Sequence, residues 1–392
     1  MKKLVLSLSI VALFLGSCSS DNEEITTDPI PTGTISGEIT TDKSYPKGNY
    51  TIQGTVKVKN GGSLTIEAGS VITAVLTDGS DALLVENGGK LFLNGTAALP
   101  IVFTEASKTP GSWGGIIMVG DAPIVGAKSV ATATTEDGNN LPYGGTNDTH
   151  NGGTLKYVRV EYAGKKLTDN TSEMNGFSFY SVGSGTVLEN LVAYKGADDG
   201  FEFYGGTVSA KNLISYGNFD DSFDWQDGWR GDANTNWYAY QVVTGNYGME
   251  IEAKSINNAF GPKVSNITLT RAAGTVTEGG ASANEFDAIQ FKKEGNGEYT
   301  NVVISGYTTS NTTLTATAVR IQDKSTNDNQ VTGGKIKMLN VKINDGTSQF
   351  AGVGTTFTVA FPTGNYTTSS TATGATLTAG AWAIVDGVSL IK

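Results

Sequence analysis

The sequence predicts an all-β solenoid in which short parallel strands stack coil upon coil. The strongest observation is an internal repeat in residues 190–229, where an offset of 22 residues superposes side chains of the same kind. A repeat in the low twenties, made of apolar runs broken by Gly, Asn and Asp, is typical of stacked β-coils, since each coil buries its inward face only against its neighbours. The matched pairs are Asn190 and Asn212, Tyr194 and Tyr216, Asp198 and Asp220, Asp199 and Asp221, Phe201 and Phe223, Glu202 and Asp224, and Gly206 and Gly228.

Two further observations favour the same fold. From Ile35 onward, Val, Ile, Thr, Tyr and Phe alternate with polar residues in runs of about four to seven, and no segment shows the 3.6-residue period of an amphipathic helix. The chain holds 51 Gly and only 9 Pro, which indicates many tight turns with positive φ rather than a disordered, proline-rich chain.

Residues 1–17 predict a secretory signal peptide, because two lysines precede an apolar run that is too short to span a bilayer. The run ends in Leu15-Gly16-Ser17-Cys18, which looks like a bacterial lipobox, so we predict that Cys18 is lipidated. Residues 18–34 would form a flexible tether, whose acidic start resembles the export tag of surface lipoproteins in Bacteroidota. The sequence therefore predicts an outer-membrane lipoprotein, attached by acyl chains and displayed at the cell surface. A tether that is acidic only for solvation is the alternative.

The charge excludes one class of partner. The formal net charge is −11, and removal of residues 1–17, which carry two lysines and no acid, brings it to −13. Nucleic-acid binding needs clustered Lys and Arg, so we expect no nucleic-acid partner. Because Cys18 is the only cysteine, no disulfide can stabilise the body, and stability must come from stacked strands and any bound ions.

Residues 35–343 are the predicted β-helix. Its first coils contain two Asn-Gly-Gly turns that begin at Asn60 and Asn87, 27 residues apart, each followed by an apolar run. A long loop at about 120–153 interrupts the repeat, and long loops on rigid scaffolds often carry function. Residues 344–392, rich in Thr, Gly and Ser, would form C-terminal β-coils or a cap, because an open solenoid end exposes unpaired strand edges.

Three columns of equivalent residues follow from the repeat. Tyr162, Tyr194 and Tyr216 form one column. In the second, apolar pairs point inward and the residue between them points outward, since side chains alternate along a strand; its members are 175–179, 199–203, 221–225, 247–251, 287–291 and 317–321. The third is an asparagine ladder that satisfies backbone groups at coil corners: Asn190, Asn212, Asn266, Asn301 and Asn340.

These patterns resemble the right-handed parallel β-helix of the pectin-lyase-like superfamily. Within it, the chain is similar to a group of secreted Bacteroidota surface proteins through four phrases: Trp-Gly-Gly-Ile at 113–116, Pro-Tyr-Gly-Gly-Thr at 142–146, Tyr-Val-Arg-Val-Glu-Tyr-Ala-Gly at 157–164 and Asp-Asp-Gly-Phe-Glu at 198–202. The resemblance covers roughly residues 50–345. The group has no assigned activity, so the resemblance implies a fold and a location only.

Stacking brings carboxylates together. We expect Asp198 near Asp220 and Asp199 near Asp221, and like charges about 5 Å apart cost on the order of 1 kcal/mol in water and more when desolvated. Ca²⁺ would offset this cost, so these four residues are the predicted metal ligands and Ca²⁺ the predicted cofactor. Raised pKa values, or pairing with nearby basic side chains, are the alternatives; the basic candidates are Lys195, Lys211, Arg230 and Lys254.

A ligand-binding face is predicted beside this strip. Outward acids and aromatic rings gather there, an arrangement typical of carbohydrate clefts on β-helices, and we predict a polysaccharide or a surface protein as ligand. The predicted contacts are Glu202, Tyr204, Asp224, Trp225, Trp229, Trp237 and Glu250. In the alternative interpretation the rings belong to the core and the carboxylates cap turns.

Catalysis has weaker support in the sequence. The pair Asp198-Asp199 resembles the paired aspartates of polygalacturonases, but those enzymes also carry a Gly-His-Gly, whereas His150, the only histidine here, lies in the inserted loop, where we expect it to be exposed. The candidates for catalysis are Asp199, Asp221, Arg230 and Lys254. Three hypotheses thus remain: a surface β-helix that binds a glycan with Ca²⁺, a polysaccharide lyase or glycoside hydrolase that uses the same acidic strip, and a structural or adhesive rod.

Overall fold

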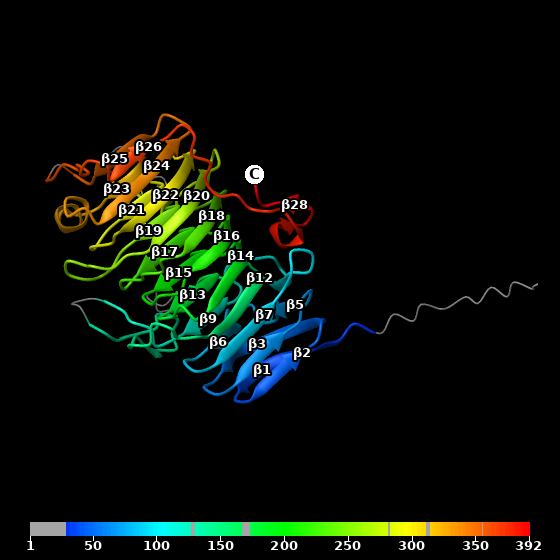
Figure 1. Ribbon diagram of the computed structural model, residues 1–392. Coiled ribbons are helices and arrows are strands. Elements are labelled where there is room, and N and C mark those ends of the chain that lie inside the picture. The colour runs from blue at the N-terminus through cyan, green and yellow to red at the C-terminus, as the bar shows by residue number, and fades with distance from the viewer. Residues whose placement is uncertain (1–28, 127–129, 167–172, 281–282, 311–313, 355) are drawn as a thin grey trace, which may run out of the picture. The chain divides into compact units, whose positions relative to one another are not determined.

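The predicted fold is confirmed: residues 31–392 form a right-handed parallel β-helix. The computed structural model describes residues 29–126, 130–166, 173–280, 283–310, 314–354 and 356–392. Within them, 24 strands join in one continuous sheet, and every strand pair in that sheet is parallel (Figure 1). Outside it, the described residues form two short antiparallel strand pairs, β10 with β11 and β27 with β28, and a few isolated bridges.

The first coils lie between residues 32 and 105. The predicted 27-residue spacing is confirmed there, because Ser63 of β4 pairs with Lys90 of β7 and Ile66 with Leu93. The strands are β1 (Thr32–Ile39), β2 (Asp42–Tyr45), β3 (Asn49–Val58), β4 (Ser63–Ile66), β5 (Val71–Ala74), β6 (Ala82–Val85), β7 (Lys90–Asn94) and β8 (Ile101–Glu105).

Each later coil contains one long and one short strand. Most long strands bend at an asparagine whose φ is positive, for example 57° at Asn190 and 58° at Asn212, and β12 bends in the same way at Tyr157. Asparagine tolerates this left-handed conformation better than most residues, so one residue turns the corner between two faces of the coil. The long strands are β12 (Gly153–Glu161), β14 (Val187–Tyr194), β16 (Ala210–Tyr216), β18 (Asn234–Gln241), β20 (Lys263–Arg271), β22 (Gly297–Ser305) and β24 (Ile336–Ile343).

The short strands form the third face. Their apolar pairs point into the core as predicted: Phe201 stacks between Phe177 and Phe223, with ring centroids 5.0 and 5.7 Å apart, and all three rings are buried. The short strands are β9 (Ile116–Val119), β13 (Phe177–Tyr180), β15 (Phe201–Tyr204), β17 (Phe223–Gln226), β19 (Met249–Ile251), β21 (Ile289–Phe291), β23 (Thr317–Ile321) and β25 (Ser348–Gly352).

The two predicted ladders of polar and aromatic side chains are present. The Asn212 amide donates to Asn190 Oδ1 at 3.0 Å, and the Asn301 amide donates to Asn266 Oδ1 at 2.6 Å. Asn236, which the sequence analysis did not include, extends the ladder by donating to Asn212 at 3.0 Å. The tyrosine column also continues beyond its predicted members, since Tyr194, Tyr216 and Tyr240 stack at 5.5 and 5.2 Å.

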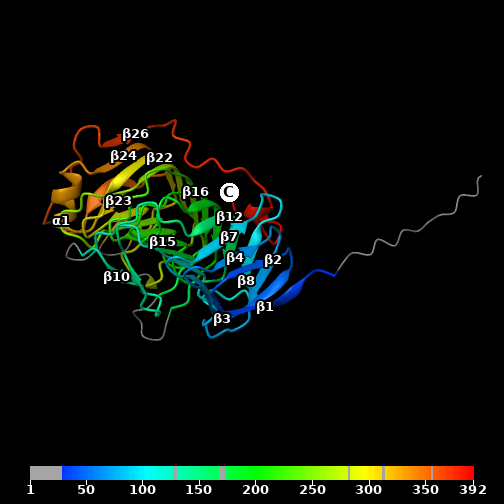
Figure 2. The same cartoon turned by 60° about the horizontal axis from the view of Figure 1, so that its bottom comes forward.

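The segment between β9 and β12 covers part of the short-strand face. It carries the small hairpin of β10 (Ala133–Thr134) and β11 (Pro142–Tyr143), drawn in teal beside β13 and β15 (Figures 1 and 2). Ile124 and Tyr143 of this segment pack on the outer side of β13 and β15, against Tyr180 and Tyr204. The inserted loop is therefore a layer over β13 and β15, and it reaches the first strand of the acidic strip.

The C-terminal residues extend the last coil and then fold back over the long strands. Strands β25 and β26 (Tyr366–Thr368) add to the last coil, where Phe350, Phe361 and Tyr366 pack together. The chain then runs back along the long-strand side, drawn in red in Figure 2, to a 3₁₀ turn at Ala381–Ala383 and a hairpin of β27 (Ile384–Val385) and β28 (Val388–Ser389). Trp382 packs against Tyr157, so this segment, residues 369–392, covers the tyrosine column; we call it the C-terminal strap.

Like the 3₁₀ turn at Ala381–Ala383, a helical segment between β23 and β24 was not predicted from the sequence. A short turn, α1 (Lys324–Thr326), continues as a π-helical turn at Asn327–Val331, between β23 and β24. Asp323 caps it by accepting from the Thr326 N–H at 2.8 Å. It is too short to show an apolar period, which explains why it was missed. Across the described residues, no helix combines the length and the apolar character that a membrane crossing requires.

Candidate functional site

The outward residues of the short strands form a column that is acidic on β15, β17 and β19 and continues with Gln290 and Arg320. Glu202 lies in register with Ser178 on one side and Asp224 on the other, and Asp224 lies in register with Glu250. Because these positions alternate with inward rings, the fold that buries the rings also places three carboxylates on neighbouring strands.

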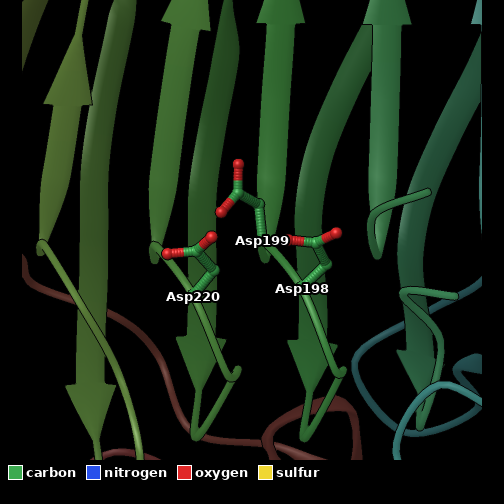
Figure 3. A group of neighbouring side chains, drawn as sticks. All are labelled: Asp198, Asp199 and Asp220. Atoms are coloured by element: carbon green, nitrogen blue, oxygen red, sulfur yellow. The ribbon is translucent and has the colours of Figure 1, made fainter. Parts of the chain in front are cut away.

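A second set of carboxylates comes from the turns that lead into β15 and β17. Asp198 and Asp220 occupy matching positions of neighbouring coils, and Asp199 lies between them (Figure 3). The two sets are continuous. Carboxylate oxygens lie within 4.8 Å of one another in three overlapping groups: Asp198, Asp199 and Asp220; Asp199, Glu202 and Asp224; and Asp221, Asp224 and Glu250. We call these seven residues the carboxylate ladder.

Part of the ladder has a structural role that the sequence analysis gave as an alternative. The Asp221 N–H donates to Asp199 Oδ1 at 2.8 Å, and the Tyr247 N–H donates to Asp221 Oδ1 at 2.6 Å. Each of these carboxylates therefore fixes the turn of the next coil. Asp287 repeats the arrangement by accepting from the Thr317 N–H at 2.6 Å, which shows that turn capping alone explains one oxygen of each aspartate.

Other oxygens of the ladder have no protein partner. Asp198 Oδ2 and Asp224 Oδ1 are buried and accept no hydrogen bond in the described part of the chain. Asp198 is only 1% exposed. A buried, unpaired carboxylate oxygen carries the full cost of desolvation, so these two atoms indicate that a proton or a cation belongs beside them.

Basic side chains reach only the two ends of the ladder. Lys166 lies 3.9 Å from Asp198 at one end, and Lys292 forms an ion pair with Glu250 at the other. The five carboxylates in between take part in no ion pair with a described residue. Neither lysine was among the predicted partners, and extending the register of β19 to β21 by one residue past Phe291 sets Lys292 opposite Glu252, with which it also pairs at 3.5 Å, not opposite Glu250.

Burial and mutual repulsion raise the pKa values of the ladder. Burial is the main cause at every position, and neighbouring carboxylates add to it. The pKa of Asp220 rises to about 7 and that of Glu202 to about 8. For Lys166, burial alone would lower the pKa, but the charges of Asp198 and Glu278 raise it above its usual value, so this lysine stays protonated.

Glu202 links the ladder to the inserted segment. Its carboxylate accepts from the Tyr204 hydroxyl, from the Asn175 amide at 2.6 Å and from the Gln226 amide at 3.0 Å. The charge of Glu136, on the inserted segment, contributes to the raised pKa of Glu202. Tyr204 itself is covered by Tyr143 of that segment, so the predicted role of Tyr204 as an exposed ligand contact is wrong.

The predicted tryptophan contacts are also wrong. Trp225, Trp229 and Trp237 are 2%, 1% and 0% exposed, respectively, and form one cluster inside the coils. Trp225 alternates with Asp224 on β17 and faces inward, while the Trp229 indole N–H donates to the Val208 carbonyl at 3.0 Å. The alternative assignment of these rings to the core is the one that holds, because strand alternation leaves the outward positions to the acids.

The four candidates for catalysis do not form one site. Asp199 and Asp221 precede their short strands, whereas Arg230 and Lys254 follow theirs, at the opposite edge of the parallel face. Lys254 forms ion pairs with Glu136 at 3.3 Å and Glu252 at 3.4 Å. Burial would lower its pKa, but these charges raise it above its usual value, so Lys254 is a poor base near neutral pH.

Arg230 and His150 lie outside the ladder as well. The Arg230 guanidinium packs over the Phe260 ring, 3.7 Å from its centroid. His150, predicted as an exposed loop residue, is buried instead, and the Gly183 N–H donates to its Nδ1 at 3.4 Å. Burial is the main cause that lowers the pKa of His150. Cys18 and the signal peptide fall outside the described residues.

Comparison with known proteins adds the family. A family model described as "Pectate-lyase like beta helix domain" matches residues 33–385, nearly the whole described body. No curated protein and no solved structure matches the chain.

Proposed function

The chain belongs to the pectate-lyase-like β-helix family, and on that premise we propose that it is a surface protein that binds Ca²⁺ on the carboxylate ladder and, through the bound ions, an acidic polysaccharide. Lipid attachment through Cys18 and display at the outer membrane belong to the same proposal. They derive from the signal sequence, the lipobox-like segment and the acidic tether.

The observation that carries the proposal is the set of unpaired oxygens in the ladder. Three groups of carboxylate oxygens within 4.8 Å of one another supply the hard, anionic ligands that Ca²⁺ prefers. Asp198 Oδ2 and Asp224 Oδ1, each without a hydrogen bond, belong to different groups, so the residues fit more than one cation. Asp199 and Asp221 each keep one oxygen that turn capping does not use.

A bound cation would also provide a contact for a ligand. Asp220, Asp224 and Glu250 are only partly buried, so ions beside them would face solvent on one side. Ca²⁺ takes six to eight oxygen ligands, about twice what one group of three carboxylates provides with one oxygen each. The remaining positions suit water or the carboxylates of an acidic polysaccharide. With the tryptophans in the core, recognition would rest on charge and not on ring stacking.

Calorimetry and thermal unfolding test the cation part of the proposal. We expect Ca²⁺ to bind the purified chain and to raise its Tm, and chelator to reverse the shift. Asp198→Asn and Asp224→Asn should weaken binding, whereas Asp232→Asn, a change at an exposed aspartate on a different turn, should leave it unchanged. A Tm that does not respond to Ca²⁺ in the unsubstituted chain would refute the proposal.

A second experiment separates binding from catalysis. The chain is incubated with acidic polysaccharides and Ca²⁺, and unsaturated uronide absorbance and new reducing ends are followed. Binding without either product supports the proposal. Either product would replace it with the lyase or hydrolase hypothesis, for which the described basic groups nearest the ladder, Lys166 and Lys292, offer only ion-paired lysines.

A further inference from the structure

A cavity of about 380 Å³ lies beside the tyrosine column, away from the carboxylate ladder. Its wall is mostly apolar, and its polar groups are concentrated at Lys108, Lys195, Thr244 and Asp386. A cavity of this size that is largely apolar, with a few polar groups, is typical of sites for small molecules. The apolar lining comes from Pro110, Tyr162, Tyr194, Phe219, Val242 and Val243. We call it the tyrosine cavity.

Val243 at its rim has an unusual conformation. Its φ is 74°, a region that β-branched residues rarely adopt, and its side chain is 69% exposed. The Val276 N–H donates to its carbonyl at 3.0 Å, which holds the strained turn in place, and Val276 is itself 53% exposed. At the mouth of the cavity, Val243 thus has an unfavourable backbone conformation and exposes an apolar side chain to water.

The hydroxyls of Tyr162 and Tyr194 and the Lys195 ammonium are polar groups at this otherwise apolar lining. Tyr162 and Tyr194 are 4% and 8% exposed, yet their hydroxyls form no hydrogen bond with any described residue. Lys195 takes part in no ion pair with a described residue, and its Nζ lies 5.2 Å from the centroid of the Tyr194 ring. Lys108 is held by Asp386 of the C-terminal strap at 2.7 Å, so among the described residues that line the cavity Lys195 is the lysine without an ion pair, and its charge acts on Asp386 only at longer range.

We propose that the tyrosine cavity binds a small organic anion with a flat apolar face. The apolar face would lie against Phe219 and Val243, the acid group would pair with Lys195, and the tyrosine hydroxyls would bond polar atoms at the edge of the ligand. Charge complementarity supports an anion, because a free lysine at an apolar cavity stands out on a chain with a formal net charge of −11.

The cavity is separate from the proposed cation site, but shares turns with it. Lys195 and Asp198 belong to one turn, and Phe219 immediately precedes Asp220 on the next. The side chains of the earlier residues line the cavity, and those of the later residues belong to the ladder. The test therefore uses chelator throughout, so that its result does not depend on Ca²⁺ binding.

Two fluorescent probes that differ in one charged group test the proposal. The first is 8-anilinonaphthalene-1-sulfonate, an aromatic anion, and the second is N-phenyl-1-naphthylamine, the same ring system without the sulfonate. We expect the unsubstituted chain to bind the sulfonate more tightly. Lys195→Gln should raise the Kd of the sulfonate about three- to ten-fold and leave that of the neutral probe unchanged. Phe219→Ala should raise both Kd values roughly ten-fold.

Controls separate the cavity from other apolar patches and from misfolding. Lys211→Gln removes an exposed lysine from the same stack of strands and should change neither Kd. Each variant is compared at a temperature below its own Tm. Equal affinity for the two probes, or binding of the sulfonate that neither Lys195→Gln nor Phe219→Ala weakens, would overturn the proposal. Absence of sulfonate binding would overturn it as well.

Discussion

The outer face of the short strands changes character at β15. On the N-terminal side, Ile117, Tyr180 and Tyr204 lie under the inserted segment and pack against Tyr143. On the C-terminal side, Asp224 and Glu250 continue the register of Ile117, Ser178 and Glu202 and are only partly buried. The same backbone geometry thus carries a closed apolar layer in one region and an electrostatic conflict in the other. This difference indicates that carboxylates in register are stable on this scaffold only where a cation or a proton neutralises them.

The largest expected effect is a loss of folding stability with rising pH, which arises from the carboxylate ladder. The folded pKa values of Glu202 and Asp220, about 8 and about 7, lie above the ordinary values of 4.5 and 3.8. The folded state therefore binds more protons, and stability present below about pH 4 is lost as the pH rises to about 8, by up to about 1.4 kcal/mol per unit and group. His150, whose pKa is lowered, acts in the opposite direction below pH 6.5, but it is one group against several.

Chemical denaturation at pH 5 and pH 8 in chelator measures this loss. We expect the urea midpoint to be lower at pH 8, and added Ca²⁺ to restore most of the difference, because the cation replaces the proton. A urea midpoint that is the same at both pH values would show that ionisation of the ladder does not destabilise the folded chain.

The second prediction tests how much the packing of the inserted segment stabilises the closed region. Tyr143→Ala removes a ring that packs against Tyr180 and leaves Asp227 without its hydroxyl donor, so we expect a loss of about 3–4 kcal/mol in the free energy of unfolding. Tyr143→Phe keeps the ring and should cost only about 1–2 kcal/mol. Urea denaturation of both variants measures the two costs, and equal losses would contradict the packing role of the ring.

The third prediction concerns the open region. The substitution of Asp224 should change the stability of the chain in a direction that depends on Ca²⁺. In chelator at pH 8, Asp224→Asn removes one charge from the ladder and should stabilise the chain by on the order of 1 kcal/mol. With Ca²⁺ present, the same change removes a proposed ligand and should lower the Tm instead. Thermal unfolding under the two conditions shows whether the sign reverses. Destabilisation in both conditions would indicate that the Asp224 carboxylate is purely structural.

The smallest effect lies at the boundary between the regions. Glu136 and Lys254 form a partly exposed ion pair at 3.3 Å, so Glu136→Gln should change stability by no more than about 0.5 kcal/mol. Because the Glu136 charge helps to raise the pKa of Glu202, the substitution should lower that pKa. An NMR titration of the Glu202 carboxyl measures the change, and a pKa that stays the same would show that the two groups do not interact.

The repeat made most of the fold predictable. The 22-residue offset predicted the registers Phe201 to Phe223 and Glu202 to Asp224, and the structure has both. The clustering of Asp198, Asp199 and Asp220 follows from the same offset, since a parallel coil places equivalent residues on top of one another. The aromatic part of the site was not predicted correctly, because clustering of tryptophans in the sequence does not place them on one surface, and strand alternation already sets Trp225 on the opposite side from Asp224.

The sequence by itself determined the coil: its period, its inward apolar pairs and its asparagine corners are local patterns that repeat, and each repeat constrains the next. Only the tertiary structure decided which surfaces stay open. Tyr143 covers Tyr204 from 61 residues away in the chain, and Trp382 of the C-terminal strap covers Tyr157 from a still greater separation. No periodicity encodes such contacts, because they depend on where two non-repeating segments fold back on the coils. Those segments leave only Asp220, Asp224 and Glu250 of the carboxylate ladder partly exposed.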